Sequence, residues 1–466
     1  MRVIDFMRQR ERGLNMKNRL NAPMIMAAAA AAALIRVAQP AAAQTAPTFM
    51  TLGPADAALY RPDGRTPQVA VLVMHRTADY LRHPACRELS ARGYLVLCMN
   101  TRYTNNEALV RFERIALDVK AGVQFLRAQP GIRNVVLFGH SGGGPTMSFY
   151  QAVAENGTGY CKGTNKLVQC TDELGGLPPA DAIVFADAHS GNPVNVLRGI
   201  NPSVVNEGNP LRIDSSLDPF DPKNGFNPNG ASHYSADFRK RYFAAQAKRM
   251  NGLIASAQAK LAAMQRGGQS YPDDDILLIP RGGNPGAGPG ASAALFDYDP
   301  TIDEIFATAK PVKLLRNDGS IVMQIVHSVF VPDPKLAELH RTFDGGTKLL
   351  TLRSFLSANA VRSSDSLEQI DHCSSNNSTV CAVQSISVPE LFVAMGAHYF
   401  VRDSEEEFER AKSRDKDMIV IEGATHGFTP CTRCEKAPGQ YSNSMKNFFD
   451  YVAGWISARF GQDSQR

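Results

Sequence analysis

Two parts of the chain alternate between short apolar segments and longer segments of helical periodicity. The apolar segments, rich in β-branched side chains, are 68–74, 93–98, 135–138, 181–186, 388–395 and 417–422. Such segments are typical of buried strands. Apolar residues at helical spacing predict helices over 84–92, 107–128, 145–155, 404–412 and 442–459. Strands that alternate with helices predict an α/β fold with a doubly wound, mostly parallel sheet, in which reactive side chains gather beyond the carboxyl ends of the strands.

The middle of the chain differs from these two parts in composition and in hydrophobic pattern. Residues 191–385 are rich in Pro, Gly and Asn, and contain one long amphipathic segment at 235–264 and a shorter one at 335–342. This stretch is far too long for a loop between two strands. We therefore expect a core built from 44–190 and 386–466, with 191–385 inserted as a large cap. A cap beside the strand ends would enclose a substrate pocket.

The N-terminal segment has the pattern of a targeting signal. Residues 24–35 form an apolar run that is too short to span a bilayer. Basic residues precede this run, and Ala-Ala-Ala-Gln at 41–44 follows as a small-residue cleavage site. The pattern predicts a secretory signal over 1–43, removed on export to the periplasm or the outside of the cell. An uncut membrane anchor is the alternative, and we expect no membrane span in the mature chain.

Charge argues against a nucleic-acid partner. The whole sequence has 50 Lys and Arg against 45 Asp and Glu, a net charge of +5. Residues 1–43 hold seven basic and two acidic residues, which accounts for all of that excess. The remaining chain is formally neutral, without the basic excess that a nucleic-acid-binding domain normally carries.

The cysteines lie as close pairs in the sequence. The eight are Cys86 and Cys98, Cys161 and Cys170, Cys373 and Cys381, and Cys431 and Cys434. In an exported protein they predict short-loop disulfides, although spacing alone leaves the connectivity open. The C-x-x-C at 431–434 is half of a possible zinc site, but no second C-x-x-C completes it. We expect no metal and no cofactor.

One strand, turn and helix segment carries the strongest chemical signal. The apolar run 135–138 leads into Gly139-His140-Ser141-Gly142-Gly143, which matches G-x-S-x-G, and a helical segment follows. This is the context of a nucleophile elbow, in which a sharp turn lifts the serine hydroxyl above the sheet. Small residues on both sides of the serine let strand and helix approach closely. Ser141 is the candidate nucleophile, and a glycine-rich turn in some other α/β protein is the alternative.

A serine hydroxyl needs a base to take its proton. His426 lies in the loop Gly-Ala-Thr-His-Gly-Phe, directly after the last predicted strand. That position places the imidazole at the same sheet edge as Ser141, although the two residues are far apart in the chain. A surface or helix-capping role is the alternative for His426.

The elbow, the strand ending in His75-Arg76-Thr77 and the loop around His426 together resemble the α/β-hydrolase superfamily, of the serine esterase and lipase type. The resemblance implies that the N–H of Gly142 supplies one oxyanion donor, and that a backbone N–H at Arg76 or Thr77 supplies the other. A glycine commonly stands in the family where this chain has Arg76. The arginine side chain either narrows the pocket or offers its cation to an anionic group of the substrate.

The acid of the triad departs from the family pattern. The usual position, after the penultimate strand, is occupied by residues 396–399, which contain no carboxylate. Asp187, at the end of the strand 181–186, is the first candidate, and Asp403 and Glu405 are the next. The acid must reach Nδ1 of His426, to fix its tautomer and stabilise its cation.

His75, His398 and Tyr399 are expected to line the substrate pocket. The prediction is an exported serine hydrolase that cleaves a carboxylic ester of a small molecule through an acyl-enzyme. Amide or lactone cleavage uses the same groups. Haloalkane and epoxide hydrolysis is disfavoured, because relatives of that kind have Asp at the position of Ser141. The alternative from another class is a secreted, non-catalytic binding protein on a hydrolase scaffold.

Overall fold

The computed structural model describes residues 46–64, 66–267, 273–283, 294–331 and 346–461. The predicted secretory signal 1–43 and the predicted helix 335–342 lie outside these ranges. Residues Gln44–Arg466 form one compact unit. Among the described helices, none combines the length and the apolar character that crossing a membrane requires.

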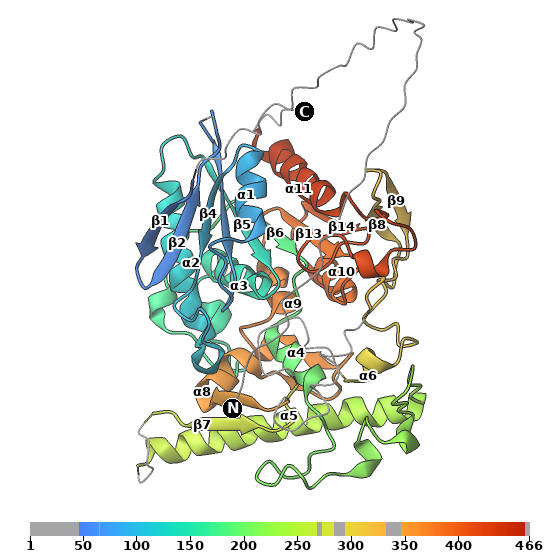
Figure 1. Cartoon of the computed structure of the whole chain (residues 1–466). Helices are drawn as coiled ribbons and strands as arrows, with labels where there is room; N and C mark the ends of the chain where they lie inside the picture. The colour runs from blue at the N-terminus through green and yellow to red at the C-terminus, as the bar shows by residue number, and fades with distance from the viewer. Residues whose placement is uncertain (1–45, 65, 268–272, 284–293, 332–345, 462–466) are drawn as a thin grey trace, which may run out of the picture. The chain divides into compact units, whose positions relative to one another are not determined.

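A ten-stranded sheet forms the centre of this unit (Figure 1). In spatial order its strands are β1 (Thr48–Leu52), β2 (Ala55–Tyr60), β4 (Leu95–Met99), β3 (Val69–Met74), β5 (Asn134–His140), β6 (Ala182–Ala186), β13 (Glu390–Met395), β14 (Lys416–Ile421), β8 (Val312–Leu315) and β9 (Ile321–Gln324). The strands from β4 to β8 in this order run parallel, and β1, β2 and β9 are antiparallel to their neighbours. The prediction of a mostly parallel sheet is confirmed.

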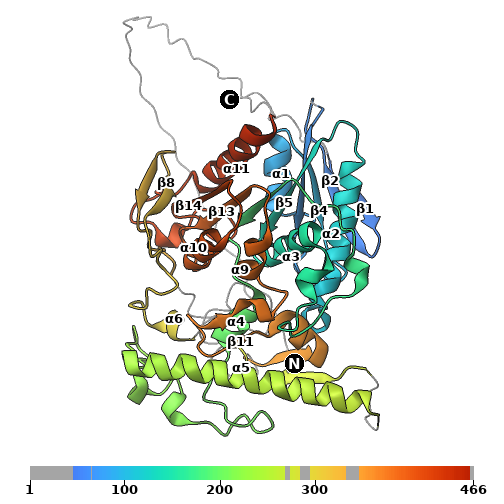
Figure 2. The same cartoon turned by 180° about the vertical axis from the view of Figure 1, so that it is seen from behind.

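Helices cover both faces of the sheet (Figure 1 and Figure 2). Helices α1 (Pro84–Ala91) and α11 (Ser444–Phe460) pack on one face, against the buried side chains that β3, β4 and β5 direct to that face. Helices α2 (Phe112–Arg127), α3 (Gly143–Asn156) and α10 (Val401–Arg410) pack on the other. The strands carry apolar side chains on both faces because both faces are covered. This is the doubly wound arrangement that the sequence predicted.

Three details of the secondary structure differ from the prediction. The predicted helix 107–128 is a separate 3-10 turn at Glu107–Leu109 followed by α2. Helix α10 begins at Val401 and ends at Arg410, earlier than the predicted 404–412. Strands β1 and β2 were not predicted, because β1 is largely exposed and the Ala-rich β2 lacks the β-branched residues that mark a strand.

The segment 191–385 has its own apolar clusters, built around the long helix α5 (Ala236–Gln265). Its other described α-helices, and its described strands outside the central sheet, are α4 (Asn192–Gly199), β7 (Ile276–Ile279), α6 (Ala294–Tyr298), β10 (Lys348–Thr351), α8 (Leu352–Ser354), β11 (Arg362–Ser363), β12 (Ile370–Asp371) and α9 (Thr379–Ala382). Strands β7 and β10 pair with each other, outside the central sheet.

The boundaries predicted for the inserted cap need correction. Strand β8 lies within 191–385, yet it pairs in parallel with β14 and extends the central sheet, with β9 beside it. Helix α9, near the end of the same range, packs against α3 of the core. Four-residue strands such as β8 and β9 are too short to give a clear hydrophobic pattern, so the sequence did not separate them from the surrounding irregular segment.

All eight cysteines are paired in disulfides. The bonds join Cys86 to Cys98, Cys161 to Cys170, Cys373 to Cys381, and Cys431 to Cys434. Each bond closes a short loop between neighbours in sequence, as predicted. The C-x-x-C at 431–434 is therefore a disulfide in this structure.

Candidate active site

Ser141 lies on a strained turn between β5 and α3. Its φ is 56°, in the left-handed region that a residue with a side chain rarely adopts. A Cβ on Gly139 would lie 2.6 Å from the carbonyl oxygen of Gly143, and one on Gly143 would lie 2.3 Å from that of Met74. Only glycine fits at these two positions, which explains the G-x-S-x-G pattern. The Ser141 N–H donates to the carbonyl of Ala186 at 3.2 Å, so the turn is tied to the end of β6.

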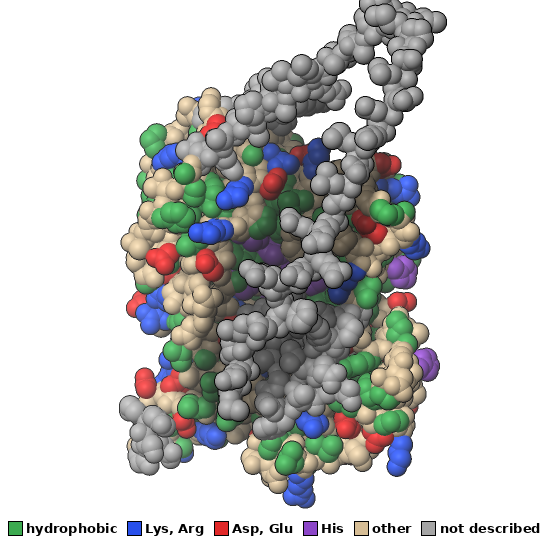
Figure 3. Space-filling model, in the orientation of Figure 1, with side chains coloured by type: hydrophobic (Ala, Val, Ile, Leu, Met, Phe, Trp, Pro, Cys, Tyr) green, Lys and Arg blue, Asp and Glu red, His purple; other side chains and the backbone are tan. Residues whose placement is uncertain are grey.

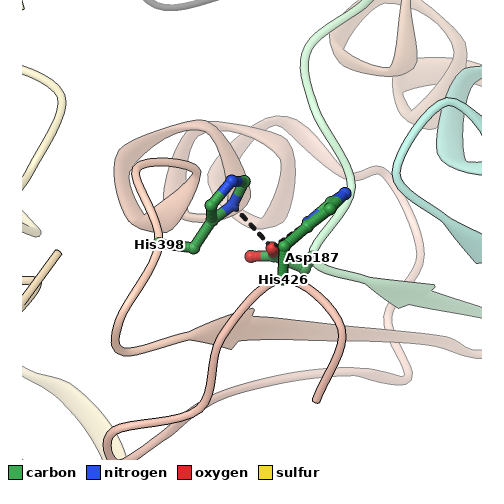
Figure 4. Close-up of side chains that lie close together, drawn as sticks. All are labelled: Asp187, His398 and His426. Atoms are coloured by element: carbon green, nitrogen blue, oxygen red, sulfur yellow. Dashed lines mark hydrogen bonds and ion pairs between the residues drawn. The ribbon is translucent and has the colours of Figure 1, made fainter. Parts of the chain in front are cut away.

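Asp187 and His426 form a hydrogen-bonded pair at the same edge of the sheet (Figure 4). Asp187 follows β6 with a φ of 45°, and is fully buried. Its Oδ2 lies 2.5 Å from Nδ1 of His426, and its Oδ1 accepts the N–H of Met395 at 3.1 Å. Of the three candidate acids, Asp187 is the one that contacts His426.

Asp403 and Glu405 make other contacts. Asp403 pairs with Arg198, with 2.9 Å between Oδ1 and Nη1. Glu405 accepts the backbone N–H groups of Ala309 at 2.7 Å and Lys310 at 2.9 Å. Both carboxylates therefore anchor α10 to the segment 191–385, and neither reaches His426.

His398 lies against the pair on its buried side. Its Nδ1 is 2.7 Å from Oδ2 of Asp187, and its ring stacks on that of His426 with the centroids 4.3 Å apart. The contact with Asp187 is close but poorly directed, and neither ring nitrogen of His398 makes a hydrogen bond within the described part of the chain. Burial lowers the pKa of His398, although Asp187 opposes that shift. Burial alone would raise the pKa of Asp187, but the imidazoles of His398 and His426 lower it below its usual value. The carboxylate of Asp187 is therefore ionised.

The same three side chains raise the question of a metal. One donor atom from each of Asp187, His398 and His426 lies within 4.8 Å of the other two. A tetrahedral zinc ion with bonds of about 2.1 Å would hold its ligand atoms about 3.4 Å apart. The 2.5 Å between Asp187 and His426 is instead a hydrogen-bond distance. The geometry is that of a carboxylate that orients an imidazole.

Two further histidines support the loop that carries His426. The backbone N–H of Ala85 donates to Nδ1 of His83 at 3.3 Å, which assigns the proton of His83 to Nε2. That nitrogen lies 3.0 Å from Nδ1 of His140, and Nε2 of His140 lies 2.8 Å from the carbonyl oxygen of His426. Burial lowers the pKa of His83 to about 3, and lowers that of His140 well below its usual value. Apart from the position of His140 next to Ser141, no sequence pattern indicated these hydrogen bonds between histidines.

The loop after β3 packs against the elbow. A Cβ on Gly142 would lie 2.7 Å from Nε2 of His75, so the ring of His75 covers that glycine. Nδ1 of His75 accepts the N–H groups of Thr77 at 3.0 Å and Ala78 at 2.8 Å. The N–H of Thr77 is therefore already bonded, and the expectation that it serves as an oxyanion donor is not supported.

Arg76 is buried in this loop, with a side chain that is 2% exposed. Its Nη2 lies 2.6 Å from Oε1 of Glu107, whose other oxygen accepts the hydroxyl of Thr77 at 2.9 Å. The carbonyl of Arg76 accepts the hydroxyl of Thr101 at 2.7 Å. Sequence reasoning missed Glu107, because a glutamate at the start of a predicted helix has the ordinary explanation of a favourable helix-dipole contact.

Tyr399 is buried beside His398, with the two ring centroids 4.2 Å apart. On the other side its ring meets that of Phe330 edge to face. Figure 3 shows histidine side chains near the middle of one face of the molecule. His426 itself is partly accessible, with 19% of its side chain exposed.

No family model matches the sequence, and no curated protein matches it. Among solved structures, the chain is similar to DcsB in complex with its substrate analogue, with 11% identity, a TM-score of 0.42, and coverage of 90% of this chain and 100% of that one. A carboxyl esterase from Bacillus coagulans has 10% identity, a TM-score of 0.39, and coverage of 89% and 98%. A monoacylglycerol lipase from Paleococcus ferrophilus has 11% identity, a TM-score of 0.36, and coverage of 88% and 99%.

These similarities are too low to assign a site. The fold is defined by the chain's own geometry: a doubly wound, mostly parallel sheet with a strand, G-x-S-x-G turn and helix at its centre. That arrangement is the α/β-hydrolase fold.

Proposed function

We propose that this protein is a serine hydrolase that cleaves a carboxylic ester of a small molecule. Ser141 is the nucleophile, His426 the general base and Asp187 the acid that orients it. The observation that carries the proposal is the 2.5 Å hydrogen bond between Asp187 and His426, made at the sheet edge where Ser141 stands on a strained turn.

Two backbone contacts support the convergence of the three residues. The N–H of Ser141 bonds to Ala186, the residue directly before Asp187. His140, directly before Ser141, bonds to the carbonyl of His426 and packs its ring 4.4 Å from that of His426. Ser141 is thus tied to the residue before Asp187, and His426 to the residue before Ser141.

The proposed reaction follows from the proton positions. Nδ1–H of His426 donates to Asp187, which leaves Nε2 as the acceptor for the hydroxyl proton of Ser141. The serine oxygen attacks the ester carbonyl, and His426 passes the proton to the departing alcohol. A water molecule, activated by the same imidazole, then releases the acid from Ser141.

The N–H groups of Gly142 and Arg76 are the proposed oxyanion donors. Gly142 directly follows the nucleophile, at the start of α3, where backbone N–H groups favour a developing negative charge. The alternative donor, Thr77, is bonded to His75, so the donor on the β3 side is assigned to Arg76.

Export is the second part of the proposal. Four disulfides persist in oxidising compartments and are rare in the reducing cytosol. Together with the predicted secretory signal over 1–43, they support a periplasmic or extracellular location, with the mature chain beginning near Gln44.

A fluorophosphonate probe tests the enzymatic proposal. The oxidised, folded protein is expected to be labelled covalently at Ser141, and Ser141→Ala is expected to abolish labelling. Ser148→Ala, which removes another buried serine hydroxyl from α3, is the matched control and should leave labelling intact. A folded protein that is not labelled would favour the non-catalytic binding protein. Parallel assays with matched esters, amides and lactones then identify the bond that is cleaved.

A further inference from the structure

Among the described residues, the charges of Arg76 and its two charged neighbours do not cancel. Arg76 is paired with Glu107. Lys348, at the start of β10, is 6% exposed, and β10 lies beside the 3-10 turn that begins at Glu107. Burial lowers the pKa of Lys348 to about 8, with Glu107 raising it and Arg76 lowering it further, so the amine is mostly protonated near neutral pH. Two cations and one carboxylate leave an excess of one positive charge.

The guanidinium of Arg76 is also short of partners. Its Nε and Nη1 are buried and make no hydrogen bond within the described residues. A buried donor without an acceptor is costly, and a charged one more so, which makes such a group unusual in a purely structural role. Arg102 is the contrasting case: its Nε and Nη2 both bond to the buried Asp118, at 3.0 and 2.7 Å.

The loop that carries this cation packs against the proposed nucleophile elbow. Arg76 directly follows His75, whose ring covers Gly142. The backbone N–H of Arg76 is also one of the two proposed oxyanion donors, because the N–H of Thr77 is bonded to His75. The Arg76 charge also reaches His189, two residues beyond Asp187: burial, and next Arg76, lower the pKa of His189 to about 3. His189 and the other buried histidines here are therefore neutral, and do not compete with Arg76 and Lys348 for an anion.

We propose that the substrate is an ester that carries a carboxylate, and that this carboxylate binds to Arg76 through Nε and Nη1, with Lys348 as the second cation. The inference rests on the proposed esterase function and narrows its substrate class. A single negative charge matches the single excess positive charge, which favours a carboxylate over a doubly charged phosphate. Guanidinium groups are well suited to bind carboxylates in a buried site.

Two pairs of esters test the proposal in the wild-type protein. In the first pair the carboxylate is on the acyl side: mono-para-nitrophenyl glutarate against para-nitrophenyl pentanoate. In the second it is on the alcohol side: para-acetoxybenzoate against its methyl ester. In at least one pair, kcat/KM is expected to be about 10- to 100-fold higher for the anionic ester, the range typical of a hydrogen bond to a charged group. Glutarate or benzoate should also inhibit cleavage of the neutral ester competitively.

Variants then locate the selectivity. Arg76→Gln should bring the anionic-to-neutral ratio close to one, and Lys348→Gln should lower it by a smaller factor. Arg102→Gln is the matched control, because it breaks a comparable ion pair with the buried Asp118 and leaves the Arg76 side chain and its partners unchanged. It should lose stability and keep the ratio. If Arg76→Gln does not fold, the ratio and the inhibition measured in wild type still decide the question.

The two proposals fail differently. If neutral esters are cleaved and Ser141 is labelled, but neither anionic ester is preferred, the carboxylate site is wrong and the esterase function stands. If no ester is cleaved and Ser141 is not labelled, the esterase function itself is wrong. If Arg102→Gln lowered the anionic-to-neutral ratio of kcat/KM as much as Arg76→Gln does, the effect of Arg76 would be one of stability alone. That result would also overturn the proposed carboxylate site.

Discussion

The interior of the sheet and the edge at the carboxyl ends of its strands differ in side-chain polarity and in backbone strain. In β3 and β5 the apolar side chains are fully buried, and their pattern fits the strand period and the two covered faces. Directly after β5 and β6, Ser141 and Asp187 have positive φ angles, and histidines and a carboxylate are buried there. Strain and buried polar groups weaken a fold, so their concentration at one edge indicates a site maintained for chemistry. The comparison predicts that changes at the edge alter activity, and that changes in the interior alter stability.

The largest effect is expected from Asp187→Asn. Asparagine keeps an oxygen for the N–H of Met395, but no longer holds His426 in the productive tautomer or stabilises its cation. We expect kcat to fall by about 10⁴-fold, as in other serine hydrolase triads, with a small change in the melting temperature. The measurement is steady-state kinetics with a chromogenic ester, together with thermal unfolding.

Asp403→Asn is the matched control for that variant. It breaks the buried pair with Arg198 and should reduce stability while leaving kcat within a few-fold of wild type. If the two variants lost activity equally, the assignment of the acid to Asp187 would not hold.

The interior counterpart is Leu72→Ala, in the same strand that leads to His75. Leu72 is fully buried between β4 and β5, and truncation of such a side chain costs about 2–5 kcal/mol in the free energy of unfolding. The remaining folded protein should keep its kcat. Denaturant unfolding and active-site titration measure the two quantities separately, and a large loss of kcat per labelled serine would erase the distinction between interior and edge.

A smaller effect is expected from His140→Phe. Nε2 of His140 lies 2.8 Å from the carbonyl oxygen of His426, so His140 is expected to act by positioning the loop that carries the proposed base. Loss of that hydrogen bond should lower kcat about 10- to 100-fold through misplacement of the imidazole. His140→Gln keeps a side-chain N–H and should recover part of the loss. A variant with an unchanged kcat would show that the His426 loop is held without this contact.

The smallest expected effect is a change in the pH dependence of stability. The pKa of His83 is lowered by burial to about 3 in the folded protein, whereas an unfolded histidine titrates near 6.5. Between these values the unfolded chain binds one proton more than the folded chain, so His83 makes stability fall as pH falls below about 6.5. The free energy of unfolding should change by about 1.4 kcal/mol per pH unit for this proton.

His83→Gln removes this proton uptake. Its unfolding free energy, measured by denaturant titration between pH 6 and pH 4, should fall less steeply than that of wild type, by the slope of one proton. Identical slopes would mean that His83 is protonated in the folded state. The description of His83 as a neutral side chain that supports His140 and the His426 loop would then be wrong.

The sequence predicted the interior better than the edge because hydrophobic periodicity is a local signal. The six strands it indicated are all present, and glycines at 139 and 143 marked the elbow. Strands β8 and β9 were missed because four residues carry little pattern, and this error also placed the boundaries of the inserted segment wrongly.

At the edge, the sequence identified residue types but not their contacts. Asp187 was ranked ahead of Asp403 and Glu405 from its place at a strand end, yet only the folded chain shows which of them meets His426. The pairing of Arg76 with Glu107 and the bond from Thr77 to His75 depend on how loops pack, which no short motif records.

Trapping of the acyl-enzyme tests the central claim most directly. Wild-type protein mixed with a para-nitrophenyl ester and quenched in acid within milliseconds should show a burst of nitrophenol, together with one acyl group on the peptide that contains Ser141, found by mass spectrometry. Asp187→Asn should slow the burst, and Ser141→Ala should give neither signal. Turnover of the ester with no acyl group on Ser141, or with the group on another residue, would contradict the account.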